Sequence, residues 1–282
     1  MPSLSNAYQA AHAASGELRA RALLCLLESD PFEKVAAVNA MADAVRANAC
    51  TPDPSAQLQA PEDRPIPGRP DLPQLVLPSA LGKRSMNTVE GRAMLIHALA
   101  HIEFNAINLA LDALWRFPGL PAAYYTDWLK VAEEESLHFS LVAAHLVTLG
   151  YAYGDFTAHG SLWEMVAKTT GDALARMALV PRVLEARGLD ANPPMRAKIA
   201  QAGDHQAAAI LDIILRDEIG HVEVGNRWYR HLCAQRGLAP RATFAALCEE
   251  YWAPVPRGPF NIEARRLAGF TEEEIADLCA NK

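Results

Sequence analysis

The chain has 282 residues, of which 51% are hydrophobic, and a formal net charge of -7 at pH 7. That length and apolar content allow a large buried core, whereas the acidic balance disfavours a broad nucleic-acid-binding surface, which needs clustered basic side chains. The five cysteines are scattered without Cys-x-x-Cys spacing, which disfavours a disulfide framework and a structural zinc site. We expect a cytoplasmic protein, because the N-terminus has no signal-peptide pattern and no apolar stretch has the length of a membrane span.

Residues 1–50 are expected to form a pair of helices. The first spans about residues 5–28, with its apolar side chains on one face. Asp30-Pro31 opens the second, because aspartate caps a helix and proline is tolerated in its first turn. Neither helix carries a plausible set of metal ligands.

Residues 51–87 are expected to form a proline-rich arm. Eight prolines from Pro52 to Pro78 exclude a regular helix and a central strand. A flexible linker would also explain the prolines, but the apolar residues among them favour an extended segment that packs on the neighbouring bundle.

Residues 88–238 are expected to form a four-helix bundle. The helices have these approximate bounds: 88–117, 121–149, 161–187 and 193–236. Pro118-Gly119, Gly150 and Gly188 end the first three, and prolines open the fourth. Pro181 lies inside the third helix, where it removes a backbone hydrogen bond and should kink or loosen the chain.

Residues 239–282 are expected to form a C-terminal helical extension. Thr271-Glu-Glu-Glu274 is a capping-box pattern, which predicts the start of the last helix. The extension would cover one end of the bundle or form a homodimer contact, and the sequence does not separate these alternatives. All four segments are expected to belong to one compact unit.

Two strings of the form Glu-x-x-His dominate the functional interpretation: Glu135-Ser-Leu-His138 and Glu218-Ile-Gly-His221. Positions i and i+3 lie on the same face of a helix, so each string directs a carboxylate and an imidazole to one point. A single match is common on helix surfaces and carries little weight. Two matches inside long apolar-periodic segments are far more specific.

The chain also supplies the carboxylates that would complete a dinuclear site. Such a site between four helices needs two Glu-x-x-His pairs and one further Glu from each remaining helix. Glu103 precedes Glu135 by 32 residues, and Glu185 precedes Glu218 by 33. All these glutamates lie on apolar helix faces that contain almost no Arg or Lys, which favours metal ligation over buried salt bridges. The predicted ligands are Glu103, Glu135, His138, Glu185, Glu218 and His221.

This order of ligands resembles the ferritin-like di-iron carboxylate superfamily. Longer strings, such as residues 100–109, 180–190 and 216–222, resemble a bacterial ferritin-like family of unknown function, DUF455. A more distant likeness is to the di-iron tRNA hydroxylase that oxidises an isopentenyl adenosine. The resemblance implies an all-α, ferritin-like four-helix bundle and a metal site, but no substrate.

Two further acids are candidates for hydrogen bonds to the ligand histidines. In oxygen-activating relatives, an acid just before the ligand glutamate bonds the histidine of the opposite helix. The resemblance therefore implies that Asp217 pairs with His138 and that Glu134 pairs with His221. Glu134 lies in a run of three glutamates, and a solvent-facing position would explain it equally well.

The predicted function is that of a non-haem di-iron oxidoreductase that activates dioxygen or peroxide. It would act on a small molecule or a modified base and would need an electron donor. Manganese or a mixed iron–manganese pair would also suit the ligands. Two alternatives stay open: metal handling, as iron oxidation or dimanganese peroxide removal, and a scaffold that metals only stabilise. We assign Glu135 and Glu218 as bridging ligands, although sequence alone does not decide which carboxylates bridge.

Overall fold

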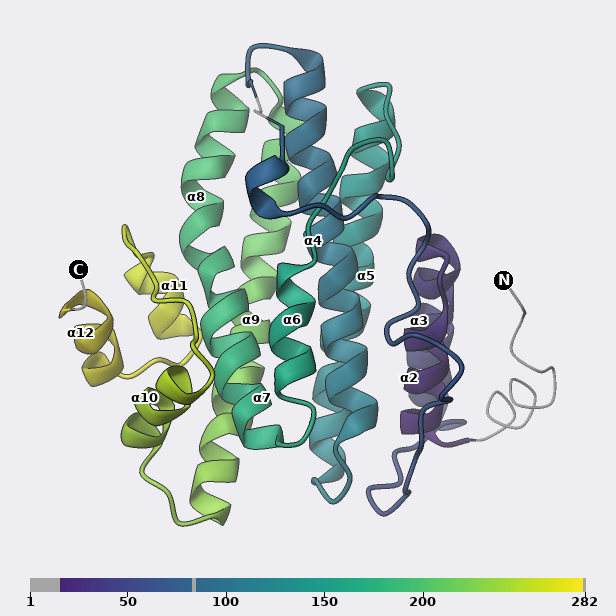
Figure 1. Ribbon diagram of the computed structural model, residues 1–282, viewed down its shortest axis with the longest axis vertical. Helices are drawn as coiled ribbons and strands as arrows, with labels where there is room; N and C mark the ends of the chain where they lie inside the picture. Colours follow the sequence, from purple (N-terminus) through teal and green to yellow (C-terminus); the bar gives the residue numbers. More distant parts are fainter. Residues whose placement is uncertain (1–15, 83–84, 281–282) are drawn as a thin grey trace. The chain divides into compact units, whose positions relative to one another are not determined.

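A computed structural model describes residues 16–82 and 85–280 of the chain (Figure 1). Within these residues the regular elements are helices, and extended pairing is limited to two isolated bridges. The predicted all-α class is therefore confirmed. Residues 5–15 of the first predicted helix lie outside the described residues.

The chain forms two compact units by its internal contacts. Unit 1 contains residues 16–82 and Met94–His159, and unit 2 contains residues 85–93 and 160–280. Unit 1 carries one predicted ligand triad, Glu103, Glu135 and His138, and unit 2 carries the other. The predicted division into four segments stays a prediction.

Unit 1 is built on two long helices and a helical pair. Its elements are α2 (Leu18–Leu27), α3 (Pro31–Arg46), η1 (Pro78–Ala80), most of α4 (Val89–Arg116) and α5 (Ala122–Thr148). Asp30 caps α3 by accepting hydrogen bonds from the amides of Phe32 and Glu33, with Pro31 in the first turn. In Figure 1, α2 and α3 lie together, and α3 also contacts α5.

Buried cations hold the proline-rich arm to the helices of unit 1. The Arg19 guanidinium donates to the carbonyls of Asp53 at 3.0 Å and Ala56 at 2.7 Å. The Lys34 ammonium donates to the carbonyl of Gly68 at 3.1 Å. These contacts satisfy backbone carbonyls that an irregular segment cannot pair within itself.

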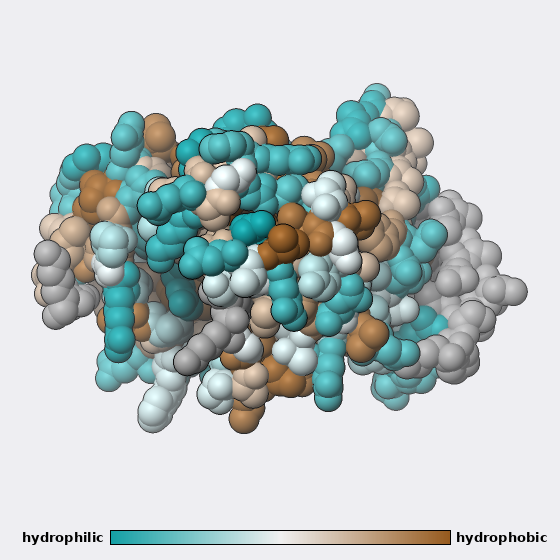
Figure 2. Space-filling view, turned by 90° about the horizontal axis from the view of Figure 1, so that it is seen from above, coloured by the Kyte–Doolittle hydropathy of each residue, from teal (hydrophilic) through white to brown (hydrophobic). Residues whose placement is uncertain are grey.

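Helix α4 is, among the described residues, the one that is long and apolar enough to span a membrane by length and composition. The expectation that no stretch reaches this length is therefore wrong. However, 78% of its most apolar window is buried inside the protein, as in the core helix of a globular fold. Figure 2 shows hydrophobic residues mixed with hydrophilic ones on the face that it presents.

Unit 2 consists of short and long helices joined in close succession. They are α6 (Ser161–Lys168), α7 (Ala173–Leu179), the π-helix η2 (Val180–Glu185), α8 (Ala186–Gln201), α9 (His205–Gln235), α10 (Pro240–Glu250), α11 (Ile262–Leu267) and α12 (Glu272–Ala280). Both α7 and α8 contact α9, and α11 contacts α8 and α9.

The predicted helix boundary at Gly188 and Pro193 is wrong. Helix α8 continues through Gly188, Pro193 and Pro194, and the chain turns only at Gly203, whose φ is +86°. Packing explains the difference, because Leu189 and Ile199 on either side of the prolines are almost fully buried. Tertiary burial here outweighs the local cost of two prolines inside a helix.

The predicted irregularity at Pro181 is confirmed. Residues Val180–Glu185 form a π-helix between α7 and α8, and Pro181 is its second residue. A proline has no amide hydrogen to donate, and the wider π-turn accommodates that missing bond. The predicted ligand Glu185 therefore ends an irregular turn instead of lying within a regular helix.

Candidate metal centre

The triad of unit 1 converges in a buried position. Glu103 comes from α4, and Glu135 and His138 come from successive turns of α5. The Nδ1 atom of His138 lies 3.2 Å from Oε2 of Glu135 and 3.5 Å from Oε2 of Glu103. One donor atom from each residue lies within 4.8 Å of the others. The sequence prediction that α4 and α5 bring these three side chains together is therefore met by the geometry.

These separations fit a coordination sphere. Metal–ligand bonds of about 2.0–2.2 Å place neighbouring ligand atoms roughly 3.0–3.5 Å apart in tetrahedral or octahedral geometry. The contacts of His138 at 3.2 and 3.5 Å fall within that range. The distances from His138 to the two carboxylates are thus those expected between ligands of one ion.

The charge of His138 depends strongly on its two carboxylate neighbours. Burial alone would lower the pKa of His138, but hydrogen bonds to Glu103 and Glu135 outweigh it and raise the pKa to about 11. An imidazolium would supply one positive charge to two carboxylates. A divalent cation beside a neutral imidazole would balance both carboxylates.

Aromatic side chains that adjoin two of these ligands in the sequence pack on one another in unit 1. Phe104 follows Glu103, Phe139 follows His138, and their ring centroids are 5.8 Å apart. Tyr153 packs against both rings, with centroid distances of 5.9 and 5.2 Å. Its hydroxyl lies 2.9 Å from Nδ1 of His101. Sequence reasoning missed this contact, because the segment 151–160 shows only loop composition.

The triad of unit 2 lies on α9 and η2. Nδ1 of His221 is 3.8 Å from Oε1 of Glu218, and the His221 side chain is almost fully buried. Glu185, at the end of η2, is half-buried. The i, i+3 spacing thus brings Glu218 and His221 together, as predicted for a regular helix.

A glycine allows η2 to approach α9 closely. A Cβ atom at Gly225 would lie 2.2 Å from Cβ and 2.3 Å from Cγ of Pro181. Gly225 follows His221 by one helical turn, so it lies on the same face of α9. The missing side chain therefore sets how near the turn that carries Glu185 can come to the helix that carries Glu218 and His221.

The two acids predicted to support the histidines have neighbours on their own helices. Asp217 accepts two hydrogen bonds from Arg216, at 2.8 and 2.9 Å. Glu134 lies 3.6 Å from the Lys130 ammonium. The predicted hydrogen bonds, from Asp217 to His138 and from Glu134 to His221, would link residues of different units and stay predictions.

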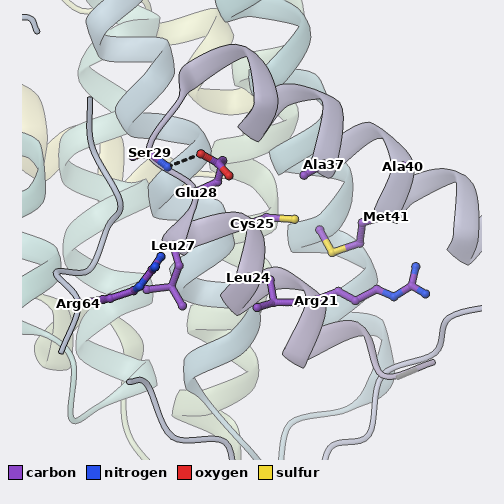
Figure 3. A pocket seen from close by; sticks show the side chains of 10 residues that line it. All are labelled: Arg21, Leu24, Cys25, Leu27, Glu28, Ser29, Ala37, Ala40, Met41 and Arg64. Carbon is purple, nitrogen blue, oxygen red and sulfur yellow. Dashed lines mark hydrogen bonds between the residues drawn. The ribbon is translucent and has the colours of Figure 1, made fainter. Parts of the chain in front are cut away.

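A separate groove lies between α2 and α3 of unit 1, with a volume of about 390 Å³ (Figure 3). Arg21, Arg64 and Glu28 line it together with apolar side chains. Cys25 also lines it, but burial raises the pKa of this thiol to about 12, which keeps it protonated and unreactive. None of the six predicted metal ligands lines this groove.

Comparison with known proteins identifies the family. Residues 27–276 match a family described as "Protein of unknown function (DUF455)", and the chain belongs to that family. An uncharacterized protein of Haemophilus influenzae is 50% identical over 264 residues, which cover 89% of each chain. No solved structure matches. The predicted family is therefore confirmed, and its description carries no activity.

Proposed function

We propose that the chain binds two metal ions through its two triads and acts as a di-iron oxidoreductase of the ferritin-like superfamily. Glu103, Glu135 and His138 would supply one set of ligands, and Glu185, Glu218 and His221 the other. The observation that carries the proposal is the convergence of two buried carboxylates and a buried imidazole in unit 1. The order Glu, Glu-x-x-His, repeated once, supports a paired site.

The cost of burial favours metal over an ion pair. Carboxylates lose their hydration in a core, and this loss must be offset by charge and by hydrogen bonds. Glu135 and His138 are fully buried, and Glu103 is 3% exposed. Two buried carboxylates and a buried imidazole in one place favour a bound divalent ion, because its charge offsets the hydration that these groups lose on burial.

The donor set favours iron or manganese. Four carboxylates supply hard oxygen donors, and a single imidazole per ion leaves room for further ligands. When bound, a pair of such ions supplies two-electron reduction of dioxygen or peroxide. The residues of the chain hold and orient the donors, and the burial of Glu103, Glu135 and His138 keeps the triad of unit 1 away from bulk water. An organic substrate, as a small molecule or a modified base, and an electron donor would complete the reaction.

Metal stoichiometry tests this proposal directly. Protein loaded with ferrous iron under anaerobic conditions should contain two ions per chain, and mixing with air should produce near-ultraviolet absorption from ferric species. Glu135→Ala and Glu218→Ala should each lose at least one ion. Glu133→Ala and Glu223→Ala, which alter partly exposed neighbours on the same helices, should keep both.

Three results would count against the proposal. Two ions retained in both ligand variants would refute the ligand assignment. Ferrous protein that stays unchanged in air would refute oxygen activation. A native content of zinc alone, with full stability, would favour a scaffold that metals merely stabilise.

A further inference from the structure

The C-terminal part of unit 2 contacts η2 through a buried arginine. Nη2 of Arg182 donates to Oε1 of Glu274 at 2.6 Å, and both side chains are largely buried. Glu274 belongs to α12, whereas Arg182 lies in the middle of η2. This ion pair therefore joins the last helix of the chain to the irregular turn that ends at Glu185.

Three aromatic rings enclose the remaining surface of the Arg182 guanidinium. Its carbon atom lies 4.4 Å from the ring centre of Tyr229, 4.6 Å from that of Phe244 and 5.3 Å from that of Phe270. Nε and Nη1 of Arg182 have no hydrogen-bond acceptor among the described residues, so the ring faces provide their electrostatic partner. The guanidinium is thus confined by α9, by α10 and by the segment before α12.

Glu274 is itself held by other groups. Its Oε2 accepts hydrogen bonds from the Thr271 amide at 2.9 Å and from Nη2 of Arg230 at 3.2 Å. The Glu274 amide in turn donates to Oγ1 of Thr271, which completes the capping box predicted from the sequence. The carboxylate that contacts Arg182 is therefore also held by Thr271 and Arg230.

Arg265, in α11 of the C-terminal part of unit 2, contacts the chain immediately after η2. Nη2 of Arg265 donates to Oδ2 of Asp190 at 2.6 Å and to the carbonyl of Ala186 at 3.3 Å. Arg265 also packs on the ring of Phe270, 5.2 Å from its centre. Contacts from the C-terminal segment thus fall on both sides of Glu185, at Arg182 before it and at Ala186 after it.

We propose that residues 261–280 act as a positioning element for Glu185. A π-turn that contains proline lacks part of its local hydrogen bonding, so tertiary contacts must define its conformation. The Glu274–Arg182 ion pair fixes the middle of the turn, the Arg265 contacts fix the residues that follow it, and together they set the direction of the Glu185 carboxylate. This inference rests on the proposed function, in which Glu185 is a metal ligand.

Cobalt titration of the full chain tests the inference, because Co²⁺ reports its coordination by visible absorption. Glu274→Ala should lower the affinity for one of the two ions by about 10- to 100-fold, as loss of an outer contact does. Its absorption spectrum should also change. Glu273→Ala, which alters an exposed residue in the same turn of α12, should leave affinity and spectrum unchanged.

A double-mutant cycle separates positioning from general destabilisation. If Glu274 acts through Glu185, then Glu185→Ala combined with Glu274→Ala should bind cobalt no more weakly than Glu185→Ala alone. Additive losses would overturn the inference. Glu274→Gln, which keeps the side-chain shape, provides the same test if the alanine variant does not fold.

The outcomes distinguish this inference from the proposed function. Wild-type protein that binds no cobalt would refute the metal site itself. Wild-type protein that binds two ions, with Glu274→Ala and Glu274→Gln matching it in affinity and spectrum, would refute only the positioning role.

Discussion

The two units present the same kinds of ligand on different supports. In unit 1, Glu103, Glu135 and His138 project from regular stretches of α4 and α5 and are deeply buried. In unit 2, Glu218 and His221 lie on a regular helix, but Glu185 ends a π-turn and is half-buried. A regular helix fixes its side chains by local hydrogen bonds, whereas an irregular turn depends on contacts from elsewhere. The same set of donors can therefore be built with local or with long-range support.

Unit 1 differs from unit 2 in that a buried lysine, in addition to Arg19, contacts its irregular segment. In unit 1, the buried ammonium of Lys34 contacts the carbonyls of Leu26 and Gly68 and the side-chain oxygen of Asn108. In unit 2, the guanidinium groups of Arg182 and Arg265 have this role. Arginine keeps its charge at any ordinary pH, whereas a buried lysine can lose its proton. Stability and ligand geometry should therefore respond differently to mutation and to pH in the two units.

The largest loss of stability is expected from a methyl group inserted between η2 and α9. Gly225→Ala places a methyl group about where the Pro181 ring lies, and such overpacking costs about 1–3 kcal/mol, sometimes more. The variant should unfold at lower denaturant concentration and lose the ion of unit 2. The ion of unit 1 should remain.

Gly220→Ala is the matched control for this change. It lies in the same helix, and a Cβ atom there would meet nothing within 4 Å. Alanine inside a helix is favoured over glycine by about 0.5–1 kcal/mol, so this variant should be slightly more stable than wild type. Equal stability of the two variants in urea unfolding would contradict the role assigned to Gly225.

A smaller effect is expected from Asp217, whose side chain is 10% exposed and precedes the ligand Glu218. Asp217→Asn should weaken metal binding by about 10- to 100-fold if its carboxylate orients a ligand histidine. Asp212→Asn removes an exposed carboxylate from the same helix and should have no effect on metal binding. Metal titrations that agree for wild type and Asp217→Asn would show that the Asp217 carboxylate does not orient a metal ligand.

Much of unit 1 was predictable because its local signals agree with its packing. Pro118-Gly119 and Gly150 indicate the ends of α4 and α5, and the structure ends these helices at Arg116 and Thr148. The i, i+3 spacing then suffices to bring Glu135 and His138 together. In a regular helix, the spacing of two residues in the sequence determines whether their side chains lie on the same face.

Unit 2 was less predictable because its geometry depends on contacts between distant residues. Pro193 and Pro194 predict a helix start, yet burial on both sides keeps them inside α8. Arg182 and Glu274 are 92 residues apart, so no local pattern pairs them. The residues that support Glu185 therefore became visible only in the folded chain.

A pH-dependent effect on stability is expected from Lys34. Burial lowers the pKa of Lys34 from 10.5 to about 7. Between pH 7 and 10.5 the unfolded chain binds this proton and the folded chain does not, so the free energy of unfolding should rise with pH. The slope is at most about 1.4 kcal/mol per pH unit. Below pH 7 both states are protonated, and the full cost of burying the charge is present without a slope.

Lys34→Met tests this origin, because it removes the titrating group and keeps a similar volume. Its unfolding free energy, measured in urea at pH 7, 8 and 9, should lack the rise that the wild type shows over the same range. Lys130→Met, which removes an exposed lysine from α5, should retain the wild-type slope. Parallel profiles for wild type and Lys34→Met would mean that the three oxygens around the ammonium hold its proton in the folded protein. Lys34 would then act as a fixed charge, as Arg182 does in unit 2, and this difference between the units would disappear.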